Sequence, residues 1–230
     1  MNEHQPNIAF SAGGKRLTLR FESGEDHIAR TIESTGDFYE AELLADIRSR
    51  LFFAECAVDV GAHVGNHTLY FSRMLGLRTV SFEPNARTFA LLEANVRDNG
   101  VEAVCRLHNA AVGAVAGRAH AIAAADGNSG MSRVESDAAG EVPLLCLDDE
   151  LEGEARVDLI KIDVEGWELD VLRGAARIVE THRPLVYIEA SSATFPEVRA
   201  FLAGCRYVCW KRFNATPTFL FMPEERFRAP

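Results

Sequence analysis

The chain has 230 residues, of which 47% are apolar and 25% charged, a composition typical of a soluble globular protein with one sizeable domain. Acidic residues outnumber basic ones 34 to 24, and the net charge of -10 disfavours a nucleic-acid partner because it repels phosphate backbones. No apolar run approaches a membrane span, and the five cysteines lack Cys-x-x-Cys spacing, so we expect no membrane partner and a cytoplasmic protein with reduced thiols.

The first 52 residues are predicted to form an appendage that packs on the main domain. Ile8–Phe21 alternates around Gly13-Gly14, as expected for a β-hairpin. Asp37 has the character of a helix N-cap, because Glu40 follows three residues later and an apolar stripe comes next.

From residue 53 to residue 230, short apolar runs alternate with amphipathic segments, which indicates a parallel sheet covered by helices on both faces. The predicted strands are Ala57–Val60, Thr79–Phe82, Val104–Leu107, Leu159–Ile162 and Leu185–Ile188, with Tyr207–Trp210 and Phe219–Met222 as a closing antiparallel pair. Helices are expected over Asn66–Leu75, from Asn85 to Asn99, and after the fourth strand to about Val179. The predicted fold class is therefore α/β: a Rossmann-like, doubly wound, mostly parallel seven-stranded sheet with an antiparallel C-terminal strand.

A long irregular stretch, Ala111–Val157, separates the third and fourth strands. Ala119–Ala124 and Val142–Leu147 have the pattern of strands, and Asp126–Gly130 that of a loop. Because connections of this length in compact α/β domains are usually functional, we interpret the stretch as a candidate substrate cap.

The loop from Asp59 to Asn66 lies where a strand gives way to a helix. Its glycines let the backbone approach a ligand closely, but their Gly-x-x-x-Gly spacing lacks the Gly-x-Gly-x-x-Gly pattern of dinucleotide sites. A leading aspartate can pair with the ammonium group of a methionine moiety, so the loop favours S-adenosyl-L-methionine; the alternative is a tight turn without a ligand. The candidate cofactor-binding residues here are Asp59, Gly61, Ala62, His63, Gly65 and Asn66.

Three further segments supply candidate contacts to the same cofactor. Glu83 ends the second predicted strand, where a carboxylate can accept both hydroxyls of an adenosine ribose, and Pro84 fixes the turn that follows. Asn109 and Ala110 follow the third strand, where adenine would lie. Tyr39 and Glu40 precede the first core strand and are expected over the methionine end.

These residues resemble the FkbM family of methyltransferases. The matching pieces are Asp59-Val-Gly-Ala-His-Val-Gly65, Phe82-Glu-Pro84, Asn109-Ala-Ala-Val-Gly113, Leu147-Asp-Asp149, Arg183-Pro184, Ile188-Glu189 and, most specific, Asp158-Leu-Ile-Lys-Ile-Asp-Val-Glu-Gly-Trp-Glu-Leu-Asp-Val-Leu-Arg-Gly-Ala175. The resemblance implies methyl transfer from S-adenosylmethionine, commonly to a hydroxyl oxygen of a sugar, polyketide or other secondary metabolite. His63 departs from the family, which often has Asn there.

Acidic side chains end neighbouring strands in the second half of the chain. Asp163 follows the fourth strand and Glu189 the fifth, so both should emerge where ligands of open parallel sheets bind. Lys161, in the otherwise apolar Leu-Ile-Lys-Ile, shares a face with Asp163 and needs an acidic partner. The candidate catalytic residues are Asp163, Glu189, Lys161 and Glu165.

Other roles for these acids stay open. Besides a general base or polar clamp, Asp163 and Glu189 suit a Mg²⁺ site, and Glu165 suits the cap of a helix beginning near Gly166. We expect Glu168 and Asp170 to be solvated. The loop histidines His63 and His67, with His27 upstream, are alternative bases or ordinary packing residues.

Three functional classes compete. A small-molecule or glycan O-methyltransferase is favoured by the motifs. A methyltransferase of protein or nucleic acid is disfavoured by the acidic charge and by the absence of an Asn-Pro-Pro-Tyr or Asp-Pro-Pro-Tyr element. A non-methylating Rossmann-type protein, such as a dehydrogenase, is disfavoured by the glycine spacing. Trp210 and the apolar C-terminal strands either form a homodimer contact or pack internally.

Overall fold

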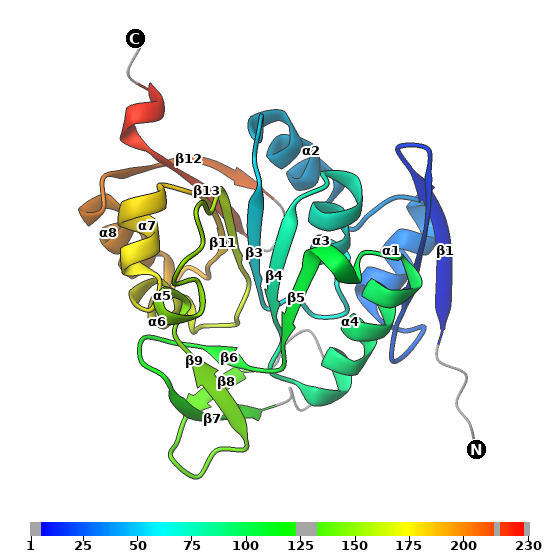
Figure 1. Ribbon diagram of the computed structural model, residues 1–230, viewed down its shortest axis with the longest axis horizontal. Helices are drawn as coiled ribbons and strands as arrows, with labels where there is room; N and C mark the ends of the chain where they lie inside the picture. Colours follow the sequence, from blue (N-terminus) through cyan, green and yellow to red (C-terminus); the bar gives the residue numbers. More distant parts are fainter. Residues whose placement is uncertain (1–5, 123–132, 214–216, 228–230) are drawn as a thin grey trace.

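The computed structural model describes residues 6–122, 133–213 and 217–227. At its centre is a seven-stranded sheet in the order β12-β13-β11-β10-β3-β4-β5 (Figure 1). The parallel strands are β3 (Cys56–Val60), β4 (Arg78–Phe82), β5 (Cys105–His108), β10 (Leu159–Ile162) and β11 (Leu185–Glu189). β13 (Thr218–Pro223) runs antiparallel to β11, and β12 (Tyr207–Phe213) antiparallel to β13. The predicted Rossmann-like sheet with an antiparallel C-terminal closure is confirmed.

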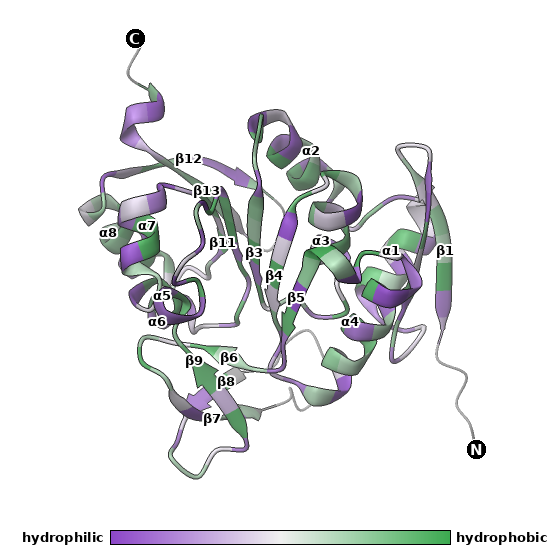
Figure 2. Ribbon diagram, viewed as in Figure 1, coloured by the Kyte–Doolittle hydropathy of each residue, from purple (hydrophilic) through white to green (hydrophobic). Residues whose placement is uncertain are grey.

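Helices cover both faces of this sheet, because successive side chains in each strand point to opposite sides. On one face lie α2 (Ala41–Arg50), α3 (Asn66–Leu69), which continues as the π-helical turn η1 (Tyr70–Met74), and α4 (Ala86–Asp98). On the other lie α5 (Leu147–Glu150), α6 (Glu168–Arg173), α7 (Ala176–His182) and α8 (Phe195–Gly204). Figure 2 shows hydrophobic residues along the central strands and on the inner sides of these helices. The two resulting apolar clusters hold the sheet between them.

The N-terminal part consists of β1 (Asn7–Ala12), β2 (Lys15–Arg20) and α1 (His27–Thr35). The predicted hairpin is present, and it contacts α4: the Asn95 and Asn99 side chains bond to the backbone of Arg20 and Thr18 at 2.7–3.1 Å. The appendage and the first apolar cluster therefore share one core.

The predicted helix start at Asp37 is wrong. The chain first forms α1, capped by the Asp26 side chain and ended by Gly36 in a left-handed conformation. The Asp37 side chain accepts from the neighbouring Phe38 amide, and α2 begins after Glu40, whose φ is 58°. α1 buries only Ala29 and Ile32 of its nine residues, although its caps, Asp26 and Gly36, are signals that the sequence offers.

The stretch between β5 and β10 contains a separate four-stranded sheet in the order β6-β9-β7-β8. Its strands are β6 (Ala111–Val112), β7 (Gly117–Ile122), β8 (Arg133–Ser136) and β9 (Val142–Leu145). Two of these match predicted strands, although β9 is shorter than expected because α5 begins at Leu147. The predicted loop Asp126–Gly130 lies outside the described residues. Short 3-10 turns are formed by Glu102–Val104 and Glu224–Phe227.

Among the described residues, no helix is long and apolar enough to cross a membrane. All five cysteines are free thiols, as predicted, and burial raises the pKa of Cys56 to about 11. Neutral thiols at this depth behave as small apolar side chains.

Gly61 is required by the packing of the backbone itself. Its φ is 79°, and a Cβ at this position would collide with the main-chain carbonyl of Asp163 at the end of β10. The Asp163 amide also donates to the Val60 carbonyl at 3.0 Å. The first loop after β3 and the end of β10 are therefore in direct backbone contact, which only a glycine permits.

We expect Gly61→Ala to destabilise the protein by about 3 kcal/mol, since steric overlap adds to the strain of a left-handed residue. Gly76→Ala is the matched control, because Gly76 has a φ of 73° and nothing lies within 4 Å of the position that its Cβ would occupy. Its cost should be about 1 kcal/mol. Urea unfolding measures both, and equal losses would contradict the close approach.

Candidate functional site

The loop after β3 is shaped by backbone hydrogen bonds. The Gly61 and Ala62 amides both donate to the Phe82 carbonyl at 3.0 Å, and Gly65 begins α3 with a φ of 97°. These bonds place the loop between the carboxyl ends of β3 and β4. In open parallel sheets this is where ligands bind.

Asp59 is completely buried one residue before the end of β3. Its Oδ2 accepts from the Thr68 hydroxyl at 2.7 Å, and that hydroxyl lies 2.9 Å from the Ser81 hydroxyl. Its Oδ1 has no hydrogen-bond partner among the described residues. A buried carboxylate oxygen without a donor is costly, so this atom is available to a positively charged or N–H-bearing ligand.

Glu83 follows β4 and is 5% exposed. One carboxylate oxygen accepts from the His63 amide at 3.0 Å and the other from the Asn85 amide at 2.9 Å. Burial outweighs these two donors and raises the pKa of Glu83 to about 7. The backbone thus fixes the carboxylate, while each oxygen keeps a lone pair for another donor.

A narrow apolar pocket lies beside Glu83. It is lined by residues from the ends of β3, β4 and β10 and from the segment after β5, including Gly61, Phe82, Pro84, Ala110, Val164 and Trp167. Asn109, in the segment after β5, donates to the carbonyls of Glu83 and Pro84 at 2.9 and 3.2 Å. The buried indole N–H of Trp167, a residue that the sequence analysis did not single out, has no acceptor among the described residues.

Lys161 is the third residue of β10 and is 1% exposed. It is paired in register with Asp59 of β3, and its Nζ donates to Asp163 Oδ2 at 2.8 Å, the pairing expected from the sequence. Burial alone would lower the pKa of Lys161, but the carboxylates of Asp163, Glu40 and Asp59 outweigh it and raise the pKa. Lys161 is therefore a permanent cation surrounded by acids.

Asp163, Glu165 and Glu189 come together at the ends of β10 and β11, each with a carboxylate oxygen within 4.8 Å of the others. Burial, followed by the charge of Asp163, raises the pKa of Glu189 to about 8, although Lys161 opposes this shift. Glu189 therefore binds a proton more tightly than an ordinary carboxylate, a property of acids in sites that move protons.

The region after β10 departs from expectation in two ways. Glu165 has a φ of 41° and does not cap a helix at Gly166, since α6 begins at Glu168. Glu168 was expected in solvent but is 3% exposed, because its side chain folds back to accept from the Gly166 amide at 2.6 Å. This hydrogen bond fixes the turn between β10 and α6. The pattern of charged residues in the sequence does not predict it.

Tyr39 and Glu40 reach the site from the N-terminal part. Burial, followed by the charges of Glu40, Asp163 and Glu189, raises the pKa of Tyr39 to about 12. The phenol therefore stays protonated at neutral pH and lies near the acids on β10 and β11. Asn66 is predicted as a cofactor contact, but its side-chain amide bonds to the Tyr39 backbone: Oδ1 accepts from the Tyr39 amide, and Nδ2 donates to the Tyr39 carbonyl.

The histidines occupy different places around this site. His63 has a φ of 51°, and burial lowers its pKa despite the opposing charge of Asp26, whose carboxylate lies 4.0 Å from its Nε2. His67 is buried beside Glu40, with 2.9 Å between Nε2 and Oε2. His27 meets the ring of Tyr39 edge to face at 5.5 Å.

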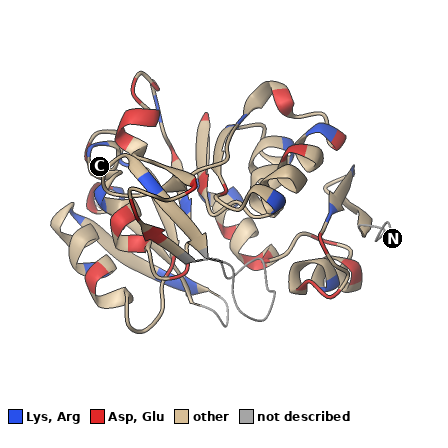
Figure 3. Cartoon of the chain, turned by 90° about the horizontal axis from the view of Figure 1, so that it is seen from below, with Lys and Arg blue, Asp and Glu red and all other residues tan. Residues whose placement is uncertain are grey.

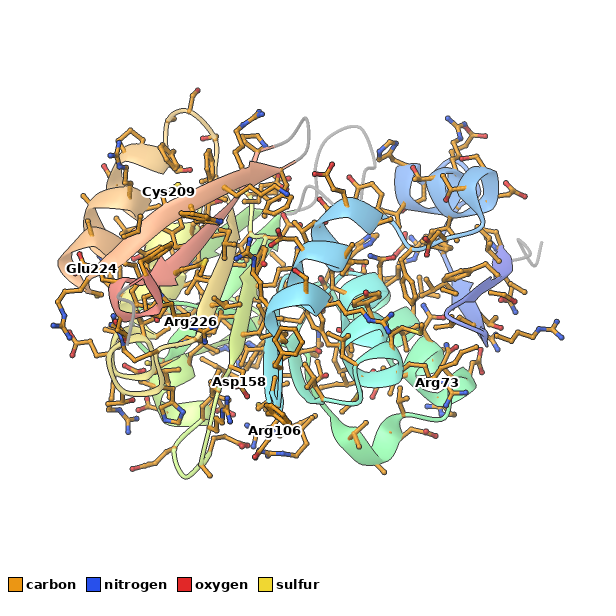
Figure 4. The ribbon with its side chains drawn as sticks, turned by 90° about the horizontal axis from the view of Figure 1, so that it is seen from above. Arg73, Arg106, Asp158, Cys209, Glu224 and Arg226 are labelled. Atoms are coloured by element: carbon orange, nitrogen blue, oxygen red, sulfur yellow. The ribbon has the colours of Figure 1, made fainter. Side chains whose placement is uncertain are left out.

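The first acid of the Asp158–Ala175 segment has a structural role. Asp158 Oδ2 accepts from the Glu55 and Cys56 amides at 2.8 and 3.2 Å, which joins the amino ends of β3 and β10. Figure 4 labels Asp158, which directly precedes β10, and Arg106, the second residue of β5. The two acids that flank β10 thus lie at opposite ends, and only Asp163 of the two faces the site.

We expect Lys161→Met to destabilise the protein by about 3 kcal/mol, because it leaves buried carboxylates without their counter-charge. Lys211→Met is the control: Lys211 also contacts two acids, at 3.5 and 3.6 Å, but is partly exposed and should cost less than about 1 kcal/mol. Equal losses in urea unfolding would contradict the buried counter-charge.

Comparison with known proteins shows the family and the fold. The family model for the methyltransferase FkbM domain matches residues 59–209, more than half of the chain. A methyltransferase FkbM from Methylobacillus flagellatus KT has a similar structure, with a TM-score of 0.56 and 20% identity; the match covers 76% of this chain but 45% of that one.

Other methyltransferase structures share the fold. A ribosomal protein L11 methylase from Lactobacillus delbrueckii subsp. bulgaricus has a TM-score of 0.50 at 13% identity, with 83% of each chain covered. A putative rRNA-methylase from Clostridium thermocellum has a TM-score of 0.52 at 10% identity, over 81% of this chain and 96% of that one. No curated protein matches the sequence. By the family match, the chain belongs to the FkbM family of methyltransferases.

Proposed function

We propose that the protein transfers a methyl group from S-adenosylmethionine to a hydroxyl oxygen of a small-molecule or glycan acceptor. The observation that carries this proposal is the buried Glu83 carboxylate, fixed by two backbone amides beside an apolar pocket at the strand ends. A carboxylate so held accepts hydrogen bonds from the paired hydroxyls of a ribose, and the apolar side chains beside it suit contact with the face of an adenine ring.

The remaining donor contacts follow from the loop after β3. Gly61 keeps side-chain atoms out of the space between β3 and β10, and the buried Asp59 Oδ1 lacks a hydrogen-bond partner among the described residues. An S-adenosylmethionine molecule brings a sulfonium and an ammonium group, which complement this acidic environment. When bound, it supplies an activated methyl group for in-line substitution.

Side chains at the ends of β10 and β11 then orient and deprotonate the acceptor hydroxyl. We assign Asp163, paired with Lys161, to orienting the acceptor hydroxyl, and Glu189 to taking its proton. The oxygen forms its bond to the methyl carbon as the carbon–sulfur bond breaks, and the hydroxyl proton passes to the Glu189 carboxylate. The raised pKa of Glu189 makes it a stronger base than an ordinary carboxylate. Tyr39, which stays protonated, can donate to the same oxygen or its neighbour.

A divalent cation such as Mg²⁺ at Asp163 and Glu189 is the alternative for this end of the site. The Lys161 ammonium already contacts Asp163 Oδ2, which supplies the positive charge that a metal would otherwise bring. Turnover that is unchanged by EDTA would contradict a metal at this site and support the arrangement in which Lys161 supplies the positive charge.

The proposed class of acceptor follows from the net charge of the protein and from the distribution of its charged residues. Figure 3 shows Lys and Arg interspersed with Asp and Glu rather than gathered on one element, and the net charge is -10. This distribution favours a neutral or cationic small molecule or glycan over nucleic acid. The four-stranded sheet β6-β9-β7-β8 is the candidate cover over the acceptor.

We expect the protein to bind S-adenosylhomocysteine but not NAD in isothermal titration. Glu83→Gln should weaken this binding about tenfold, through lost charge-assisted hydrogen bonds to the ribose. Glu102→Gln, at an exposed acid in the short turn before β5, is the control. Binding of NAD without S-adenosylhomocysteine would overturn the proposed function.

The affinity for S-adenosylhomocysteine, measured by the same isothermal titration, should depend on pH. Ribose hydroxyls donate to the ionised Glu83, whose pKa in the free protein is raised to about 7. Binding must therefore displace a proton below that pH, so affinity should fall from pH 8 to pH 6, by up to about tenfold per unit. Glu83→Gln should remove this dependence; a variant that keeps it would place the titrating group elsewhere.

Glu189→Gln should lower turnover about 100-fold, the loss typical of a missing general base, with donor affinity unchanged within about twofold. Because the base must be ionised, the wild-type rate should rise with pH through about 8. The assay is S-adenosylhomocysteine formation with an acceptor drawn from hydroxylated sugars and polyketides. Glu197→Gln on α8 is the control, and an equal loss of donor affinity in Glu189→Gln would recast Glu189 as a donor contact.

A further inference from the structure

A hollow opens on the central sheet at the amino ends of β4 and β5. It has a volume of about 230 Å³, and its lining includes Arg78, Val80, Val104, Arg106 and Glu154. Arg78 is the first residue of β4, and Glu83, which the proposed function assigns to the donor, follows the other end of that strand. The two positions are about 17 Å apart along an extended strand. The hollow is therefore separate from the donor site.

The hollow exists because little covers this part of the sheet. Val80 and Arg106 are paired in register, so the side chains of Arg78, Val80 and Arg106 share the face of the second apolar cluster. The helix α5 follows on this face, but it has only four residues and is therefore about 6 Å long. It leaves room above the amino halves of the two strands, and two arginines lie where a covered parallel strand has apolar side chains.

Glu154 pairs with Arg78 but leaves most donors of Arg106 unused. Arg78 Nη1 donates to Glu154 Oε2 at 2.7 Å, and the Glu154 side chain is 13% exposed. Arg106 Nη2 donates to the Glu150 carbonyl at 2.9 Å and lies 3.7 Å from Glu154 Oε1, beyond hydrogen-bond distance. Because a guanidinium carries several N–H donors in a fixed fork, Arg106 keeps donors for a ligand in the hollow.

Charge and size define the ligand that fits the hollow. Two arginines and one glutamate line it, which gives a net charge of +1, although the whole chain carries -10. A single negative charge balances this sum, whereas a doubly charged anion would be repelled by Glu154. Guanidinium groups bind carboxylates through paired hydrogen bonds, and Val80, Ala103 and Val104 form an apolar wall of the hollow. The volume is below the roughly 300–1,000 Å³ of pockets for drug-sized ligands, so the ligand is compact.

We propose that this hollow is a second ligand site, which binds a compact carboxylate with one negative charge and a small apolar body. The carboxylate pairs with the Arg106 guanidinium, the apolar body contacts Val80 and Val104, and Glu154 stays on Arg78. The inference does not depend on the proposed methyl transfer, because it uses other residues at the opposite end of the strands.

Benzoate is the probe, and benzamide, which has nearly the same shape without the charge, is its control. We expect benzoate to shift the methyl signals of Val80 and Val104 in ¹H–¹³C NMR spectra of the whole protein, whether or not S-adenosylhomocysteine is present. Benzamide and inorganic phosphate should each bind at least about tenfold more weakly, since benzamide lacks the negative charge and phosphate carries more of it. Shifts confined to other residues, equal binding of benzamide, or displacement of benzoate by S-adenosylhomocysteine would each overturn the inference.

Variants of the hollow test its charges separately. Arg106→Gln should weaken benzoate binding at least about tenfold, because the carboxylate loses its paired donors. Glu154→Gln should strengthen benzoate binding about threefold and allow inorganic phosphate to bind, since it removes the negative charge of the hollow. Arg173→Gln, at an exposed arginine that contacts Asp170 at 3.3 Å on α6, is the matched control and should leave benzoate binding unchanged. An unchanged affinity in Arg106→Gln, or a lower one in Glu154→Gln, would overturn the inference, with thermal unfolding as the check that each variant is folded.

Discussion

The Lys161 ammonium lies in a strand covered on both faces, where a charge without partners would cost several kcal/mol. Its counter-charges come from three separate parts of the molecule: Asp59 on β3, Asp163 after β10, and Glu40 before α2. Each of these parts must therefore be in place for the cation to be stable. The arrangement couples the N-terminal part to the strand ends and gathers the acids that the proposed chemistry uses.

The site has two electrostatically distinct ends. At β4, one carboxylate is fixed by backbone amides beside apolar walls, which suits a neutral nucleoside. At β10 and β11, several acids surround a single lysine, and one of them, Glu189, has a pKa raised to about 8. The loop after β3 lies between these ends and contributes backbone rather than side chains. A donor that is a nucleoside at one end and a zwitterion at the other matches this polarity.

The central sheet could be predicted because each strand is a short apolar run, and strand ends determine where the following acids emerge. Glu83, Asp163 and Glu189 thus reached one edge of the sheet as expected, and the Lys161–Asp163 pair followed from alternation along β10. Both depend on local geometry that the sequence encodes directly.

The rest depends on contacts between distant segments. α1 is short and buries only Ala29 and Ile32, and the helix predicted to begin at Asp37 begins after Glu40 instead. Glu40 Oε2 lies 2.9 Å from His67 Nε2, a contact between residues that no spacing rule relates. Asn66 hydrogen-bonds to the Tyr39 backbone, although its position in the loop predicts a ligand contact. Glu168 is buried because its side chain turns back on its own loop. Such tertiary effects override what polarity alone predicts.

The most direct measurement is a crystal structure of the protein with S-adenosylhomocysteine. We expect the ribose hydroxyls within hydrogen-bond distance of Glu83, adenine between Pro84, Ala110 and Trp167, and the amino-acid end between Asp59 and Glu40. A nucleoside bound away from the ends of β3 and β4, or with its ribose turned toward Glu189, would contradict this account.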